Sequence, residues 1–220
     1  MALPDNRNPT SRELTLEDNV LKTNGALVSI QAPPGWSASI TSKKTQPGLP
    51  PETFFILSKS ENSKTSIGIY FSGITYDEVD GRLRKEQLFD TDLNMKAGST
   101  EASRPVGGEG ALAGISQICH ALLAAGDHAV QFDEKHCRAV KSTQFNGMKS
   151  VIFEFENNRT GTKTFEYCID ILGNGQVVYS LYYRAAIDDF SEDIDTALKA
   201  FQSSVWRKDF DPMLPLDAVD

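Results

Sequence analysis

The chain has 220 residues, of which 40% are hydrophobic, and its net charge is −8 at pH 7. This length and composition favour one domain with a buried core. The acidic balance disfavours nucleic acid and anionic membrane surfaces as partners. No apolar run reaches the roughly 18 residues that a membrane-spanning helix needs, so we expect no membrane insertion.

The N-terminal residues and the cysteine content bear on the compartment. The first residues, MALPDNRNPTSREL, lack the basic segment and the following apolar segment of a secretory signal. Three cysteines in a protein of this length are typical of a reducing compartment. If Met1 is the native start, we expect a cytoplasmic protein; the alternative is a periplasmic protein whose signal peptide has been removed.

The first third of the sequence alternates short strand patterns with loops. Residues 1–24 are polar and rich in Pro and Asn, which predicts a flexible N-terminal arm. A single α+β domain is expected over residues 25–210, followed by a C-terminal tail at 211–220. Alternating or continuous apolar patterns predict four strands in the first part of this domain. They are residues 27–30, 36–40, 54–57 and 64–72.

The middle of the sequence is less regular. Thr75 and Glu78 have the spacing of a capping box and predict a helix that ends near Phe89. Residues 90–136 are predicted to form an irregular or helical insertion, because glycine and proline are frequent in its first part. Its second part, residues 111–125, has an apolar stripe at helical spacing.

The most regular stretch begins after a predicted strand at 137–143 and a hairpin turn at Asn146-Gly147. Three long segments alternate with period two and are rich in aromatic and β-branched residues, which predicts antiparallel strands. An amphipathic helix is expected to start after Phe190, with Ser191 as its N-cap. The three strand segments are residues 151–156, 162–172 and 176–186.

The alternation also predicts the register of these strands, because directly opposed residues share a face of the sheet. A three-residue loop at Gly173–Gly175 keeps the apolar sets of the last two strands together. By the same rule, a loop at Arg159–Gly161 pairs Phe155 with Phe165. One face of the predicted sheet is therefore apolar.

The other face is predicted to be mixed. The register places Glu154 opposite Glu166, and Glu166 opposite Tyr182. Like charges across a ladder are unfavourable, so either water solvates this face or Arg184 and a partner compensate the charges. A solvated face is the ordinary interpretation, and a binding surface is the alternative. The candidate binding residues are Glu154, Glu166, Tyr182 and Arg184.

Cysteine and histidine residues cluster within residues 119–137. Thiolates and imidazoles are preferred zinc ligands, but no CxxC or HxxxH spacing occurs, so we predict no metal site and no cofactor. A metal-dependent or cysteine enzyme using Cys119 and Cys137 is the alternative, and an exported protein could join the two as a disulfide. Because no catalytic motif is found, we expect a protein that is not an enzyme. The cluster consists of Cys119, His120, His128, His136 and Cys137.

Two stretches resemble the PsbP-like superfamily. The turn Ala32–Trp36 is similar to its P-x-GW start, and residues 146–206 are similar in their NG turn, three long strands and a helix that opens with Phe190-Ser191. The last strand and the loop before it also resemble a superfamily pattern of glycine, tyrosine, leucine and alanine residues. The matching residues here are Gly175, Tyr179, Leu181, Tyr183 and Ala185.

The resemblance covers residues 26–72 and 137–207. The superfamily includes the photosystem II protein PsbP, a Ran-binding import factor, bacterial DcrB and chaperones of type VI secretion effectors. It implies an antiparallel β-sheet flanked by helices, an α/β/α sandwich. It also implies a non-enzymatic binding or accessory protein, a chaperone or adaptor for a secreted or membrane-associated protein partner. No catalytic residues carry over.

Overall fold

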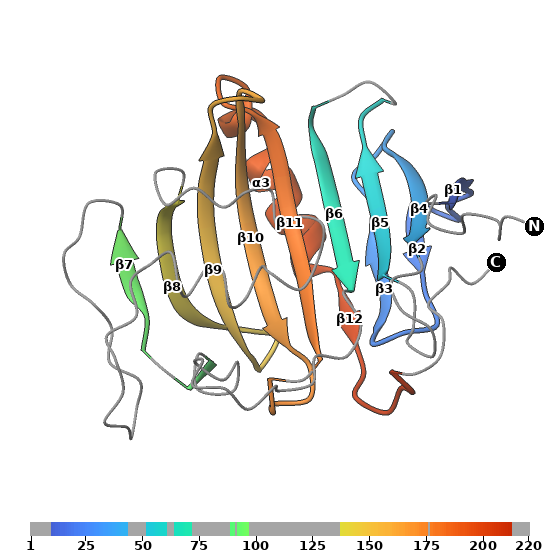
Figure 1. Ribbon diagram of the computed structural model, residues 1–220. Coiled ribbons are helices and arrows are strands. Elements are labelled where there is room, and N and C mark those ends of the chain that lie inside the picture. The colour runs from blue at the N-terminus through green and yellow to red at the C-terminus, as the bar shows by residue number, and fades with distance from the viewer. Residues whose placement is uncertain are drawn as a thin grey trace, which may run out of the picture.

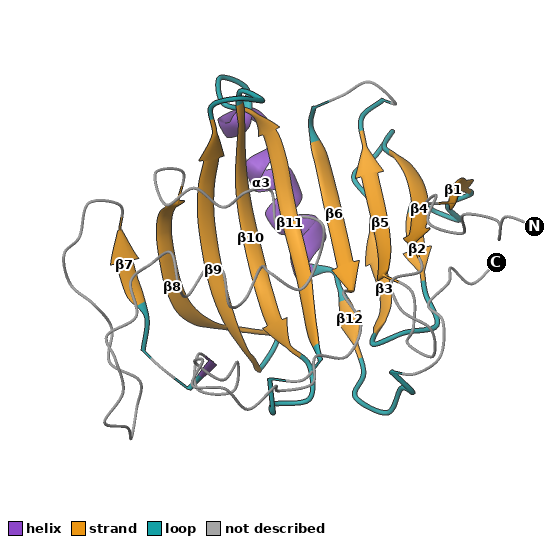
Figure 2. Ribbon diagram, viewed as in Figure 1, coloured by secondary structure: helices purple, strands orange, loops and turns teal. Residues whose placement is uncertain are grey.

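A computed structural model describes residues 10–43, 52–60, 64–71, 89–90, 92–96, 137–175 and 177–212. Most of these residues lie in β-strands (Figures 1 and 2). The strands are β1 (Thr10–Leu14), β2 (Val20–Lys22), β3 (Leu27–Gln31), β4 (Ser37–Lys43), β5 (Glu52–Ser58), β6 (Ser66–Phe71), β7 (Asn94–Lys96), β8 (Cys137–Phe145), β9 (Met148–Asn157), β10 (Thr162–Asp170), β11 (Val178–Ala186) and β12 (Val205–Trp206), and the helix is α3 (Phe190–Gln202).

The strands form two antiparallel sheets. The larger has nine strands in the order β1-β4-β5-β6-β11-β10-β9-β8-β7, and the smaller has the order β12-β3-β2. Hairpins connect neighbours in sequence, as at Asn146 and Gly147, whose φ angles of 49° and 75° suit a tight turn. Helix α3 and the smaller sheet lie on the same face of the larger sheet (Figure 1). The predicted antiparallel α+β fold is therefore confirmed, while helices on both faces remain an expectation.

The main core lies between the larger sheet and this cover. Tyr179 on β11 is fully buried and packs against two further rings. Its centroid lies 4.9 Å from that of Phe71 on β6 and 5.4 Å from that of Trp206 on β12. Aromatic pairs of this kind add about 0.5–1.5 kcal/mol each to the free energy of burial. Tyr179 therefore joins β6, β11 and the smaller sheet.

Helix α3 packs on this core through Ala197, Ala200 and Phe201. Its N-cap residue is Asp189, two positions before the predicted Ser191. The helix ends at Gln202, since the backbone then turns away to form β12. No helix among the described residues is long and apolar enough to span a membrane.

The register of β10 with β11 is the predicted one. Glu166 lies opposite Tyr182, and Thr164 lies opposite Arg184. Gly173 and Gly175 of the connecting loop have positive φ angles of 77° and 71°. This backbone conformation favours glycine, which explains why the loop could be assigned from the sequence.

The predicted register of β9 with β10 is wrong by one residue. Asn157 and not Asn158 pairs with Thr162, so the loop contains the four residues 158–161. The side-chain oxygen of Asn157 accepts hydrogen bonds from the backbone N–H groups of Arg159 and Thr160, at 3.1 and 3.2 Å. This Asx-type turn stabilises the longer loop. As a result, every residue of β9 lies on the opposite face from the one predicted.

The N-terminal arm is also more ordered than predicted. Strand β1 pairs with β4 at the edge of the larger sheet, and β2 pairs with β3. The expectation of a flexible arm is therefore wrong for residues 10–14 and 20–22. A polar edge strand lacks the apolar alternation that identifies a strand in a sequence.

Other expectations concern residues that are largely outside the described ranges. The predicted helices at 75–89 and 111–125 fall there, except for Phe89. So does most of the insertion at 90–136, although Asn94–Lys96 forms β7 and pairs with β8. The tail at 211–220 is described only as far as residue 212.

Gly68 on β6 makes room for the ring of Tyr182. A Cβ atom at this position would lie 2.0 Å from Tyr182 Cζ, far below van der Waals contact. We predict that Gly68→Ala lowers the free energy of unfolding by about 1–3 kcal/mol, despite the better strand propensity of alanine. Urea denaturation measures this change.

A double-mutant cycle separates the clash from other effects of the alanine. In a Tyr182→Ala background the ring is gone, so Gly68→Ala is expected to cost little or to stabilise the protein. An equal cost in both backgrounds would contradict the close packing of Tyr182 on Gly68.

Candidate functional site

Three of the four predicted binding residues lie together on the face of the large sheet opposite α3. Glu166, Tyr182 and Arg184 come from the adjacent strands β10 and β11. Side chains at alternate positions share a face, so three neighbours join them. We call the set the Glu166 cluster. It consists of Thr164, Glu166, Cys168, Ser180, Tyr182 and Arg184.

The carboxyl group of Glu166 is buried, with 7% of the residue exposed. Cys168 Sγ donates a hydrogen bond to Glu166 Oε1 at 3.8 Å, and the Ser180 side chain also hydrogen-bonds the carboxyl group. Burial raises the pKa of Glu166 above its ordinary value, while Ser180, the charge of Arg184 and Cys168 lower it less. Glu166 therefore keeps its proton to a higher pH than an exposed glutamate does.

Tyr182 links two neighbouring strands across this face. Its ring extends over Gly68 of β6, the residue directly opposite in the ladder. Burial raises the pKa of the Tyr182 hydroxyl, with a smaller opposing effect of the Arg184 charge. The phenol is therefore neutral throughout the physiological range.

Arg184 is half-buried at the end of the cluster that lies nearer the 158–161 loop. Its Cζ atom lies 5.2 Å from the centroid of the Tyr182 ring, within the range of a cation–π interaction. Its Nε atom donates a hydrogen bond to Thr164 Oγ1 at 3.4 Å. Two neighbours therefore fix the plane of the guanidinium group.

Glu154, the fourth predicted binding residue, does not belong to this cluster. The actual register places it opposite Phe165, on the face that carries α3. Its carboxylate lies 3.8 Å from Lys163 Nζ, which in turn lies 4.8 Å from the centroid of the Phe190 ring. The predicted facing pair of Glu154 and Glu166 is therefore wrong.

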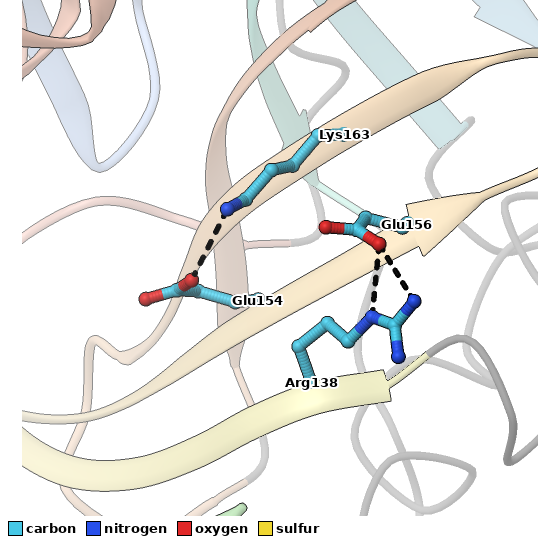
Figure 3. A network of polar contacts seen from close by, with 4 residues as sticks. All are labelled: Arg138, Glu154, Glu156 and Lys163. Carbon is cyan, nitrogen blue, oxygen red and sulfur yellow. Dashed lines mark hydrogen bonds and ion pairs between the residues drawn. The ribbon is translucent and has the colours of Figure 1, made fainter. Parts of the chain in front are cut away.

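A second ion pair lies beside Glu154. Arg138 on β8 directs Nη2 and Nε toward Glu156 Oε2, at 2.7 and 2.9 Å (Figure 3). In the same view, Lys163 reaches across to Glu154. These pairs are partly exposed, but they lie on the α3 face. The face that was expected to be solvated is instead largely buried, at Glu166, Cys168 and Tyr182, so the ordinary interpretation of that face is wrong.

The sequence did not single out the small residues that hydrogen-bond Glu166 and Arg184. Thr164, Cys168 and Ser180 are small residues whose role depends on the paired strand, and they carry no motif. Asp170 was also missed. It is buried and accepts the backbone N–H of Gly173 at 2.9 Å. An aspartate before a Gly-rich loop is a recognisable signal for such a turn, so this role could have been predicted.

The described residues do not test whether the cysteine and histidine cluster binds a metal, forms a disulfide or acts in catalysis. Cys119, His120, His128 and His136 lie outside the described residues, and Cys137 is described only as the first backbone position of β8. Within the part of the protein that the structure describes, no group of three or more His, Cys, Asp and Glu side chains could hold a metal ion. Cys168 is buried and not part of a disulfide.

Comparisons with protein-family models and with curated proteins give no match for this sequence. The geometry of the Glu166 cluster therefore has to be interpreted from its own contacts.

The raised pKa of Glu166 predicts a dependence of stability on pH. Because the folded state binds this proton more tightly than the unfolded state, Glu166 contributes stability below its unfolded pKa and loses it as pH rises through the folded pKa. Gln resembles the protonated carboxyl group. We expect Glu166→Gln to gain stability relative to wild type as the pH rises from about 4 to about 8. Urea denaturation across this range measures the gain.

Glu154→Gln is the matched control, since it removes an equal charge from the opposite face. The difference between the two variants isolates the effect of burial at Glu166. A Glu166→Gln curve parallel to that of wild type would show that this carboxyl group is not buried as described.

The exposed ion pair of Glu154 predicts a small energetic effect. We expect Glu154→Ala to change the free energy of unfolding by less than about 1 kcal/mol, because solvent screens the contact with Lys163. Chemical denaturation at low and at high salt measures it. A loss well above this value, insensitive to salt, would contradict the assignment of Glu154 to a solvated face.

Proposed function

We propose that this protein is a non-catalytic binding protein, an accessory protein of the PsbP-like kind that acts on a protein partner as a chaperone or adaptor. The observation that carries the proposal is the state of Glu166. This carboxyl group, the most buried one of the predicted site, is engaged with Cys168 and Ser180. Its role in the fold is therefore accounted for without a substrate.

Glu166 is poorly accessible to a substrate. A general acid or base has to approach the reacting atom to about 2.6–3.2 Å. Glu166 is 7% exposed and already has hydrogen-bond partners, so it is poorly placed for such a contact. On the other face, the carboxylates of Glu154 and Glu156 are paired with Lys163 and Arg138. The described charges thus support structure and recognition better than proton transfer.

The arrangement of elements supports the PsbP-like part of the proposal. Three long antiparallel strands are followed directly by α3, in the order that the resemblance implies. The proposal includes helices on both faces of the sheet, as in an α/β/α sandwich. It also includes a cytoplasmic location, with the periplasm as the alternative. Cys168 is not part of a disulfide, which is consistent with the reducing conditions of the cytoplasm.

The alternative of a cysteine or metal-dependent enzyme depends on Cys119 and Cys137. The side chains of both residues are outside the part of the protein that the structure describes. No specific observation favours this alternative, and the experiment below tests it directly.

The test starts with the purified full-length protein as bait in a lysate, followed by purification of each captured protein. We expect one partner to form a saturable complex with a dissociation constant of about 1 μM or less, by calorimetry. The same preparation is assayed against panels of ester, peptide and phosphate substrates, and its metal content is measured. Turnover that is lost in Cys137→Ala, together with no purified partner that binds, would overturn the proposal.

A further inference from the structure

We infer that Arg184 is the anchor of a carboxylate-binding site, and that its ligand is a carboxylate group presented by the protein partner. This inference rests on the proposed binding function and specifies the chemistry that the partner offers. Arg184 lies on β11 near the 158–161 end of the sheet, and it is half-buried. A partner can therefore reach it more readily than the buried Glu166.

The guanidinium group of Arg184 is held in one orientation. The centroid of the Tyr182 ring lies 5.2 Å from Arg184 Cζ, and Thr164 Oγ1 accepts a hydrogen bond from Arg184 Nε at 3.4 Å. These contacts use one edge and one face of the group. The two terminal nitrogens remain, and their parallel N–H groups match the two oxygens of a carboxylate. An arginine already held in one orientation loses little conformational entropy when it binds.

Arg184 differs in its partners from two other arginines of the described residues. Arg138 directs Nη2 and Nε at the carboxylate of Glu156. Arg207 donates to the backbone carbonyls of Asn24 and Gly25. Among the described residues, no ion pair includes Arg184. A half-buried guanidinium group without a carboxylate contact favours an external anion as its partner.

Glu166 is close in the ladder but is not that partner. Its carboxyl group is hydrogen-bonded to Cys168 and Ser180, and Arg184 affects it only through its charge. When Glu166 is ionised, it repels an anion that approaches Arg184. Removal of its charge is therefore expected to strengthen anion binding, which gives the test a variant with the opposite sign.

The surroundings favour a carboxylate over a phosphate. The residues directly opposite Arg184 on the two neighbouring strands are Ser66 and Thr164, and neither carries a positive charge. A dianionic phosphate is usually bound by several cationic or backbone N–H donors, whereas one arginine fork suits a singly charged carboxylate. The carboxylate can come from an acidic residue of the partner or from its free C-terminus.

The experiment uses the isotopically labelled full-length protein and NMR. Sodium acetate is titrated against sodium chloride at equal ionic strength, and the Arg184 side-chain Nε–H signal and the amide signals of Thr164 and Tyr182 are followed. We expect a saturable shift of these signals with acetate and no such shift with chloride. The absence of a specific acetate shift would overturn the inference.

Peptides then distinguish the source of the carboxylate. One neutral peptide carries a single Glu and an amidated end, a second carries Gln in its place, and a third has Gln and a free C-terminus. Binding of the first alone identifies an acidic residue, and binding of the third alone identifies a C-terminus. A phosphoserine peptide that binds more tightly than all three would overturn the carboxylate assignment.

Matched variants locate the site. We expect Arg184→Gln to weaken peptide binding about tenfold or more, and Arg184→Lys to weaken it as well because the fork is lost. Arg159→Gln, at the exposed hairpin tip, removes the same charge and is expected to bind as wild type. At a pH at which Glu166 of the wild type is ionised, Glu166→Gln is expected to bind more tightly. Equal losses in Arg184→Gln and Arg159→Gln would show that only the overall charge acts.

Failure of the Arg184 site can be distinguished from failure of the proposed binding function. Failure of acetate and of all carboxylate peptides, with an intact complex between the Arg184→Gln variant and a purified partner, overturns this site alone. Circular dichroism of each variant at the assay temperature checks that a loss of binding does not come from unfolding.

Discussion

The position of β10 between β9 and β11 is the constraint on which the rest of the structure depends. Both edges of β10 are hydrogen-bonded, and the two ladders together decide which side chains face α3 and which face away. Phe165 and Tyr167 face the same way as Tyr183, so rings from β10 and β11 meet Phe190 and Phe201 of α3. A shift by one residue would turn these rings away from α3 and toward the face of the Glu166 cluster. The register is thus fixed by a large apolar area rather than by any single contact.

The two faces of the sheet satisfy their polar groups in different ways. Toward the β8 edge of the α3 face, Lys163 and Arg138 pair with carboxylates in contact with water, where each pair stabilises the fold only slightly. On the other face, Glu166 is out of water and depends on neutral donors and on the charge of Arg184. A buried carboxyl group without such partners would be strongly unfavourable. The Glu166 cluster therefore limits which substitutions β10 and β11 tolerate.

How much of this could be predicted differs between the two hairpins. The loop between β10 and β11 has Gly173 and Gly175, whose positive φ angles leave few alternatives, and its register was predicted. The loop between β9 and β10 is fixed by the side-chain oxygen of Asn157, which competes with a shorter loop. The apolar alternation of β9 could not decide, because Val151 and Phe153 are buried on the face that also carries Glu166. Alternation assigns a strand to a face only where the other face is polar.

The limits of predicting strand register also explain which residues of the candidate site were identified from the sequence. Glu166, Tyr182 and Arg184 were found together because both strands and their register could be predicted, and Glu154 was placed wrongly because one loop could not. What no local pattern contains is the role of Gly68, a residue of β6 more than 100 positions away. Because it has no side chain, the Tyr182 ring can lie across β6, and Arg184 can lie against that ring. The orientation of the arginine thus depends on three strands at once, so it is a property of the assembled sheet.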